Sequence, residues 1–320
     1  EKSLERLLPL LSARINSHNK AEIRLLVGRL YQLLDDHKKA MTSLNAIPKE
    51  LTEMYPFYDV YYFRALSYLS LERTASARSE LELFQVIGKK SEFYTQGMFE
   101  LGRIMLSSGK TESGIEILHD IWDTSSDSEM SLKSAILIAE YYTDNNPDKA
   151  INYIKKYIKY PDDEYNKKIL LMLVRAYIKT EQYDNAESMI NMFSEKYPYD
   201  QNIDEINFSK GIVLLQRGEL DNALSIFNNI KKDNPFSKFI NDTDYYMALV
   251  SYKKGKTNEA IDYLIQYTAK KGVNKLFDAH YLLADIYISS GELKKAEREV
   301  VILVNRSEEH TSELQSRQSI

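Results

Sequence analysis

The sequence predicts an all-α protein: a right-handed α-solenoid of about eight helix-turn-helix repeats, preceded by half a repeat. One observation is a small residue that recurs every 36 or 37 residues, a period typical of helical repeat arrays. A second is the scarcity of chain-breaking residues, with 11 Gly and 7 Pro among 320, so turns must be short and helices plentiful. The recurring small residues are Ala40, Ala77, Gly114, Ala150, Ala186, Ala223, Ala260 and Ala296.

Residues 1–17 come first and resemble the second helix of a repeat whose first helix is missing. Ser3 lies 37 residues before Ala40, and Leu7 and Leu10 follow it at helical spacing. We therefore expect the chain to begin inside a repeat. A targeting signal or a further domain upstream would then lie outside this sequence.

Residues 18–305 are predicted to form eight repeats in one solenoid domain, each with two amphipathic helices. Apolar residues at a spacing of three and four mark one buried stripe on each helix. A second small residue, such as Gly28 or Gly211, usually stands twelve before the recurring one, where a missing side chain lets two helices approach closely. First helices are expected near 20–35, 57–71, 92–108, 129–143, 163–180, 202–217, 238–254 and 275–290. Second helices are expected near 37–46, 73–88, 110–122, 147–159, 182–196, 219–232, 256–270 and 292–305.

The turns between the helices have their own signals. Glycine follows many first helices, as at Gly109 and Gly218, and can adopt the left-handed conformation that ends a helix. Proline follows several second helices, as at Pro198 and Pro235, because it lacks an N–H group and disfavours helix in the residue before it.

Residues 306–320 form a non-native tail in this interpretation. The segment RSEEHTSELQS (306–316) matches, in all eleven residues, the translation of a common sequencing adapter. The apolar pattern of the repeats stops there. We therefore exclude this tail from the fold and the function.

Composition excludes several classes of protein and site. The chain is 43% hydrophobic with a formal net charge of −5, and this mild acidity argues against a nucleic-acid binder. No apolar run reaches the roughly 18–20 residues of a membrane-spanning helix. The absence of Cys excludes disulfides and thiolate metal sites.

The sequence also contains no recognisable catalytic or cofactor site. The segments Ser108–Thr111 and Gly255–Thr257 contain the letters GKT, but a phosphate-binding loop needs glycine where Ile104 and Val250 stand. The histidines lack the spacing of a metal site, and no pair of carboxylates is matched for acid-base chemistry. We predict no enzyme activity, no cofactor and no metal.

The run LLQRGELDNALSIFNNIKKDNP (214–235) closely resembles a tetratricopeptide repeat, and LADIYISSGELKKAEREVVIL (283–303) is similar. The repeats are two or three residues longer than the common pattern. Their ends, at 198–200 and 235–237, resemble bacterial cell-envelope members such as the outer-membrane assembly lipoproteins and the Tol–Pal coordinator family. The resemblance favours the cell envelope or periplasm over the cytoplasm.

In tetratricopeptide arrays the first helices line a concave groove that binds proteins or peptides, so the resemblance implies where partner-binding residues stand here. The alternative is that several of these side chains only pack against neighbouring helices. The groove positions are Arg29, Tyr62, Phe99, Arg103, Arg175, Lys179, Phe208, Tyr245, Tyr252 and Tyr281.

The predicted function is a non-enzymatic scaffold that binds a partner protein or peptide in this groove, in a bacterial cell-envelope complex. The aromatic and Arg residues of the groove are types enriched at binding hot spots. The alternative is a sensor or partner-binding arm of a larger enzyme or regulator whose active domain lies in the missing N-terminal region.

Overall fold

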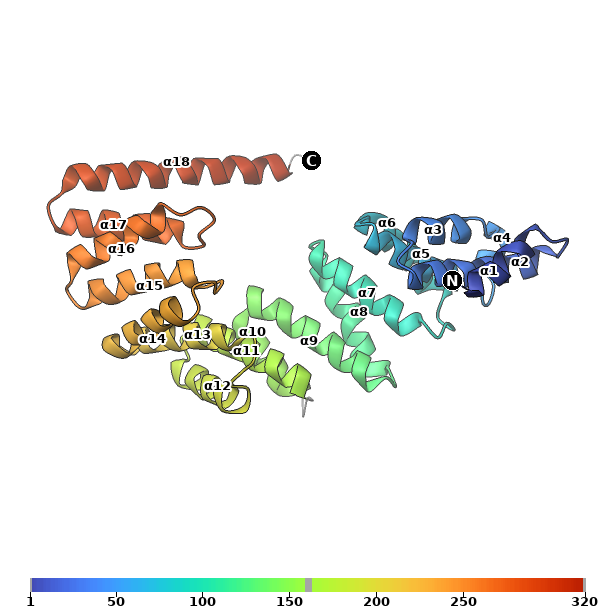
Figure 1. Cartoon of the computed structure of the whole chain (residues 1–320), viewed down its shortest axis with the longest axis horizontal. Helices are drawn as coiled ribbons and strands as arrows, with labels where there is room; N and C mark the ends of the chain where they lie inside the picture. The colour runs from blue at the N-terminus through green and yellow to red at the C-terminus, as the bar shows by residue number, and fades with distance from the viewer. Residues whose placement is uncertain (1, 159–162, 319–320) are drawn as a thin grey trace. The chain divides into compact units, whose positions relative to one another are not determined.

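The computed structural model describes residues 2–158 and 163–318, which form helices and connecting loops without a β-strand (Figure 1). The chain divides into two compact units. Unit 1 comprises residues 1–146 and 152–161, and unit 2 comprises residues 147–151 and 162–320. Among the described residues, none of the helices combines the length and the apolar composition that a membrane-spanning segment requires.

Unit 1 holds the leading half repeat and the first repeats. Its helices are α1 (Lys2–Leu7), the 3-10 helix η1 (Leu8–Ser12), α2 (Ser17–Leu33), α3 (His37–Asn45), α4 (Lys49–Thr52), α5 (Asp59–Ser70), α6 (Thr74–Ile87), α7 (Tyr94–Ser107), α8 (Thr111–Thr124) and α9 (Ser128–Asn145). Helix α10 (Pro147–Tyr157) contributes residues to both units.

Unit 2 continues the array. Its helices are α11 (Asp163–Lys179), α12 (Tyr183–Lys196), α13 (Ile203–Gln216), α14 (Leu220–Asp233), α15 (Ile240–Lys253), α16 (Thr257–Thr268), α17 (Leu276–Ser289) and α18 (Leu293–Gln318). Within this unit, α13 packs on its own second helix α14, α14 packs on the following first helix α15, and α15 packs on α16 (Figure 1).

This architecture confirms the predicted all-α solenoid, and all sixteen predicted repeat helices are present near their expected positions. Three details differ. The leading segment is not one helix, because α1 gives way to η1 around Pro9, which cannot donate a helical hydrogen bond. The short helix α4 was not predicted. Helix α18 does not end near residue 305 but runs to Gln318, since residues 306–318 contain neither Gly nor Pro.

Seven of the eight turns that follow the first helices of the described residues share one backbone conformation, and the turn after α9, with Asn146 at φ −153°, does not. In these seven turns, the residue that ends the helix has a positive φ, between 58° and 80°, and the next residue donates its N–H to a carbonyl five residues earlier, which is the Schellman arrangement. The predicted role of glycine is confirmed, but three repeats use another residue at a steric cost. The residues in this conformation are Asp35, Glu72, Gly109, Glu181, Gly218, Gly255 and Gly291.

The paired small residues lie where the two helices of a repeat cross, as predicted. A Cβ atom added to Gly211 would come within 2.6 Å of the Phe227 ring, and one added to Gly28 would meet Leu44 at the same distance. The recurring alanines such as Ala223 are fully buried. A side chain at either position would push the helices apart.

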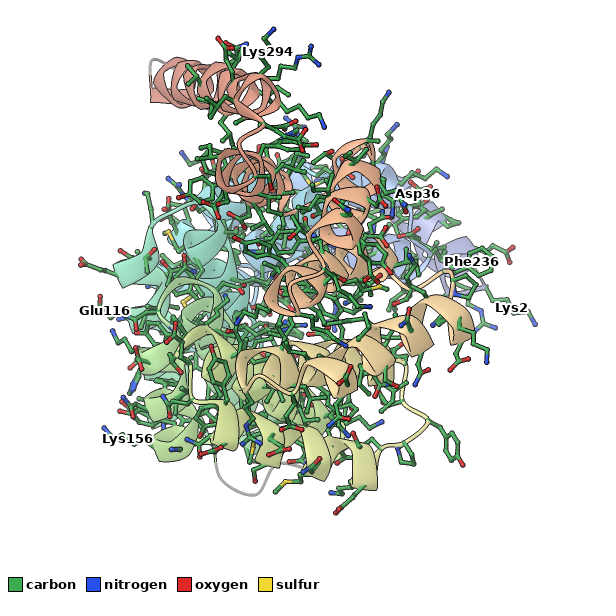
Figure 2. All side chains as sticks on the ribbon, turned by 90° about the vertical axis from the view of Figure 1, so that its left-hand side faces the viewer. Lys2, Asp36, Glu116, Lys156, Phe236 and Lys294 are labelled. Atoms are coloured by element: carbon green, nitrogen blue, oxygen red, sulfur yellow. The ribbon has the colours of Figure 1, made fainter. Side chains whose placement is uncertain are left out.

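The core consists of successive clusters rather than one centre. In unit 2, Phe227 belongs to a cluster between α13, α14 and α15, and Tyr267 to the next one between α15, α16 and α17. Charged side chains such as Lys2, Glu116 and Lys294 extend from the outside of the helices (Figure 2). Each repeat is therefore stabilised mainly by its neighbours.

Candidate functional site

Two of the ten predicted groove residues, Tyr62 and Phe208, are buried packing residues. The Tyr62 ring stacks on Phe93, with centroids 5.3 Å apart and planes 8° apart. The Phe208 ring stacks on Phe239 at 4.8 Å and 19°. In both cases the stacking partner comes from the loop that enters the following repeat. The aromatic ring therefore joins two consecutive repeats.

Tyr245 and Phe99 occupy the same repeat position and are half-buried. Tyr245 lies against Tyr246 and Tyr267, with ring centroids 5.3 and 5.7 Å away. Burial, with a smaller contribution from the negative charge of Asp278, raises its pKa to about 12. Its ring belongs largely to the packing between helices.

Tyr281 is the last aromatic residue at this repeat position and is 63% exposed. Lys179 is exposed as well. Tyr252 donates a hydrogen bond to Asp285 Oδ2 over 3.3 Å, and Arg103 pairs with Glu100 of its own helix at 2.6 Å. These four side chains remain on the surface of the first helices.

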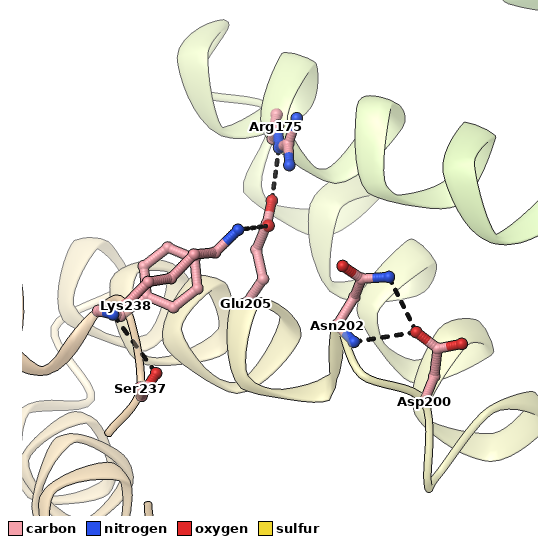
Figure 3. Close-up of polar contacts among 7 residues, drawn as sticks. Arg175, Asp200, Asn202, Glu205, Ser237 and Lys238 are labelled. Atoms are coloured by element: carbon pink, nitrogen blue, oxygen red, sulfur yellow. Dashed lines mark hydrogen bonds and ion pairs between the residues drawn. The ribbon is translucent and has the colours of Figure 1, made fainter. Parts of the chain in front are cut away.

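Arg175 on α11 belongs to a charged cluster centred on the buried Glu205 of α13 (Figure 3). Arg175 Nε donates to Glu205 Oε1 over 2.5 Å, and Lys238 Nζ donates to Glu205 Oε2 over 3.2 Å. Upstream, Asp200 accepts two hydrogen bonds from Asn202 and thereby orders the loop that leads into α13. Three consecutive repeats thus contribute to one ion-pair cluster.

The electrostatics of Glu205 follow from these contacts. Burial alone would raise its pKa, but the hydrogen bonds and charges of Arg175 and then Lys238 outweigh burial and hold the pKa below its usual value. Lys238 Nζ also lies 4.9 Å from the centre of the Phe239 ring. Glu205 therefore stays ionised and fixes both cations beside the aromatic stack.

Arg29 on α2 is the repeat equivalent of Arg175, but it makes different contacts. Its guanidinium carbon lies over the rings of Phe63 and Phe93, at 4.9 and 5.2 Å from their centres. The equivalent of Glu205 is Asp59, at the start of α5, which is 8% exposed. Asp59 Oδ1 is buried without a hydrogen-bond partner.

A pocket of about 480 Å³ opens beside Asp59 in unit 1. Helix α2, the loop before α5 and the loop between α6 and α7 supply its walls. The lining residues are Glu22, Leu25, Leu26, Arg29, Tyr55, Pro56, Asp59, Lys90, Ser91 and Glu92. It is a partly apolar recess with one buried carboxyl group, of a size that ligand sites have.

Arg29 and Arg175 are among the residues predicted from the sequence, whereas their acidic neighbours Asp59 and Glu205 are not. Glu205 and Asp59 each lie 30 residues after the corresponding arginine. One period of 36 or 37 residues leads to the same position on the next first helix, and the acid lies about two helical turns before that position, beside the arginine. This spacing could therefore have predicted both pairs. Lys238 could have been found in the same way. Among the described residues, no group of three or more His, Cys, Asp or Glu side chains could hold a metal ion.

Comparison with known proteins gives a family match and several similar structures. The model of the outer membrane lipoprotein family YfiO matches residues 158–219. No curated protein sequence matches the chain.

Among solved structures, a tetratricopeptide repeat protein from Parabacteroides merdae is 15% identical with a TM-score of 0.62, over 78% of this chain and 92% of that one. The C-terminal part of a TPR repeat-containing protein from Cytophaga hutchinsonii is 18% identical with a TM-score of 0.58, over 79% and 97%. The apo form of the quorum sensor NprR from B. thuringiensis is 16% identical with a TM-score of 0.62, over 94% and 91%. At these low sequence identities, the structural similarity shows a shared fold and nothing further.

Proposed function

We propose that this chain, a tetratricopeptide repeat protein that resembles cell-envelope families with this repeat, is a non-enzymatic scaffold that binds a partner protein or peptide on its first helices. Repeat arrays of this kind present long surfaces built from equivalent positions of successive units. The partner then contacts several repeats at once.

The observation that carries this proposal is the placement of Arg175. The buried carboxylate of Glu205 holds its guanidinium in one orientation, while 46% of the side chain stays exposed. A side chain that is already ordered loses less conformational freedom on binding. Arginine is also enriched at binding hot spots.

Three more predicted groove residues support a binding surface on the first helices of unit 2. Lys179 follows Arg175 by one helical turn, and both are exposed on α11. Tyr281 presents an aromatic ring on α17, and Tyr252 is partly exposed on α15. We propose that these side chains contact the partner, whereas the buried Phe208 supports the surface from below.

The family match favours a place in the cell envelope. The matched segment, 158–219, contains α11 to α13 and therefore both Arg175 and Glu205. We propose that the protein works in a bacterial cell-envelope complex, because the matching family is one of outer membrane lipoproteins.

The experiment is partner capture from an envelope fraction of the source bacterium, followed by affinity measurement with each captured protein. The double variant Arg175→Ala/Lys179→Ala should weaken binding of at least one partner by about 30-fold, as expected for a hot spot of roughly 2 kcal/mol. Glu116→Ala, on the outer side of α8, is the matched control and should bind normally. Unchanged affinity of the double variant for every captured protein would contradict this assignment.

A further inference from the structure

The pocket beside Asp59 in unit 1 combines apolar walls with a buried carboxyl group. Its apolar walls come from Leu25, Leu26 and Pro56, and Tyr55 stands at its edge with 73% exposure. Asp59 lies among them with one carboxyl oxygen that has no hydrogen-bond partner. A buried acceptor without a hydrogen-bond partner destabilises the protein, so binding of a donor that reaches this carboxyl group is favoured.

The repeat symmetry shows which kind of donor is missing. The residues 146 positions later are Arg175 for Arg29, Glu205 for Asp59 and Lys238 for Glu92. In unit 2 the buried carboxylate therefore receives an ammonium group, from Lys238 at 3.2 Å. In unit 1 the same position holds a second acid.

The arginine does not replace the missing lysine in unit 1. Arg29 lies over the faces of Phe63 and Phe93, whereas Ser209 stands in unit 2 where Phe63 stands in unit 1. The Phe63 ring thus gives Arg29 a cation–π contact in unit 1 at a position that carries a serine in unit 2.

The charge around the pocket also favours a cation. Glu22 and Glu92 are exposed lining residues that accompany the buried Asp59, while Arg29 and Lys90 are the cationic lining residues. Of the two, Arg29 is engaged with aromatic rings and Lys90 is exposed to solvent. An anion entering the pocket would face three carboxyl groups.

We propose that the pocket binds the side chain of a lysine residue in a peptide partner, with the ammonium group on Asp59 in the place that Lys238 takes on Glu205. This assignment rests on the proposed function, because it names one chemical feature of the partner. The four methylene groups of the lysine lie against Leu25, Leu26 and Pro56. The two carboxyl groups are similarly buried, at 8% and 6% exposure, and Lys238 shows that an ammonium group can reach such a carboxylate.

The probe is Nα-acetyl-lysine methylamide, titrated into the isotope-labelled full chain and followed by NMR. We expect saturable shifts at Leu25, Asp59 and Ser91, and no saturable shifts there with the norleucine analogue, which keeps the aliphatic chain but lacks the ammonium group. Asp59→Asn, which preserves the shape of the side chain, should weaken binding at least tenfold.

A second variant keeps the test valid if Asp59→Asn disturbs folding. Glu92→Lys changes an exposed residue and supplies the cation that unit 2 already has, so it should compete with the probe and abolish its binding. Lysine probe shifts that persist in Glu92→Lys, equal shifts with norleucine, or no saturable shifts at all would each overturn the proposal.

The outcome is separable from that of the proposed function. If the lysine probe does not bind but captured partners still depend on Arg175 and Lys179, the proposed scaffold is supported and the proposed lysine pocket is wrong. If the lysine probe binds and no partner protein is captured, the lysine pocket is supported and the proposed scaffold function is not.

Discussion

Units 1 and 2 contain the same aromatic stack at equivalent positions but surround it with different charges. Tyr62 on Phe93 in unit 1 corresponds to Phe208 on Phe239 in unit 2, and each stack joins two consecutive repeats. The neighbouring acids differ: Glu205 is paired with two cations, whereas Asp59 retains an unpartnered oxygen. Packing between repeats is thus maintained while the polar residues beside it vary.

This difference separates two kinds of position in the array. The aromatic position determines how one repeat packs on the next. The stability lost when this side chain is truncated depends on how deeply it is buried. The charged positions beside it alter what the surface can bind with little effect on that packing. Repeat proteins can therefore carry unlike sites on one scaffold.

The largest expected effect comes from the aromatic position itself. Phe208→Ala should lower the free energy of unfolding by about 3–5 kcal/mol, since it removes a buried ring between two repeats. Tyr281→Ala is the matched control at the same repeat position, and with 63% exposure it should cost less than about 1 kcal/mol. Urea unfolding of both variants measures the difference, and equal losses would contradict the assignment of Phe208 to packing.

Much of the fold could be predicted because the same pattern of small and apolar residues recurs in eight repeats. The recurring small residues located the helix crossings, and the apolar stripes located the helices. The helix break around Pro9 and the end of α18 were harder to predict, because neither feature recurs in the other repeats.

The candidate site was less predictable, for a physical reason. A side chain on a first helix faces either solvent or the next repeat, and rotation of the helix about its axis by a few tens of degrees decides which. Phe208 and Tyr281 share a repeat position, yet one is buried and the other exposed, since Phe239 and Tyr246 of the following repeat cover Phe208. Asp59 Oδ1 has no hydrogen-bond partner because Arg29 lies over Phe63 and Phe93 instead, and no sequence pattern specifies that orientation of Arg29.

The second prediction concerns pH and tests whether Glu205 and Asp59 differ as their contacts imply. The pKa of Glu205 is lowered in the folded state, so its contribution to stability is present above the unfolded value of 4.5 and is lost as pH falls through the folded pKa. Burial raises the pKa of Asp59, aided by the charge of Glu92 and opposed by Ser91 and Arg29. Its ionised form therefore destabilises the fold above that raised pKa, and the penalty disappears as pH falls toward 3.8.

Glu205→Gln and Asp59→Asn separate these opposite contributions. At pH 7 Glu205→Gln should cost about 1–2 kcal/mol, and the loss should shrink on acidification. Asp59→Asn should be neutral or stabilising at pH 7 and lose any advantage near pH 4. Unfolding free energies measured from pH 3 to pH 8 provide the comparison. Parallel pH profiles for the two variants would show that the acids are equivalent after all.

The smallest expected effect lies in the turns, where both units use the same left-handed conformation with different residues. Glu72 in unit 1 and Glu181 in unit 2 adopt φ values of 58°, which glycine adopts without the steric cost that a Cβ atom imposes. Glu72→Gly and Glu181→Gly should each stabilise the fold by about 0.5–1 kcal/mol, since relief of that cost exceeds the added freedom of the unfolded chain. Gly218→Ala, at the equivalent turn with φ of 80°, should destabilise it by about 1 kcal/mol. Thermal unfolding of the three variants decides the matter: if glycine at position 72 or 181 lowers the melting temperature, the glutamate side chain contributes more to its turn than the backbone geometry implies.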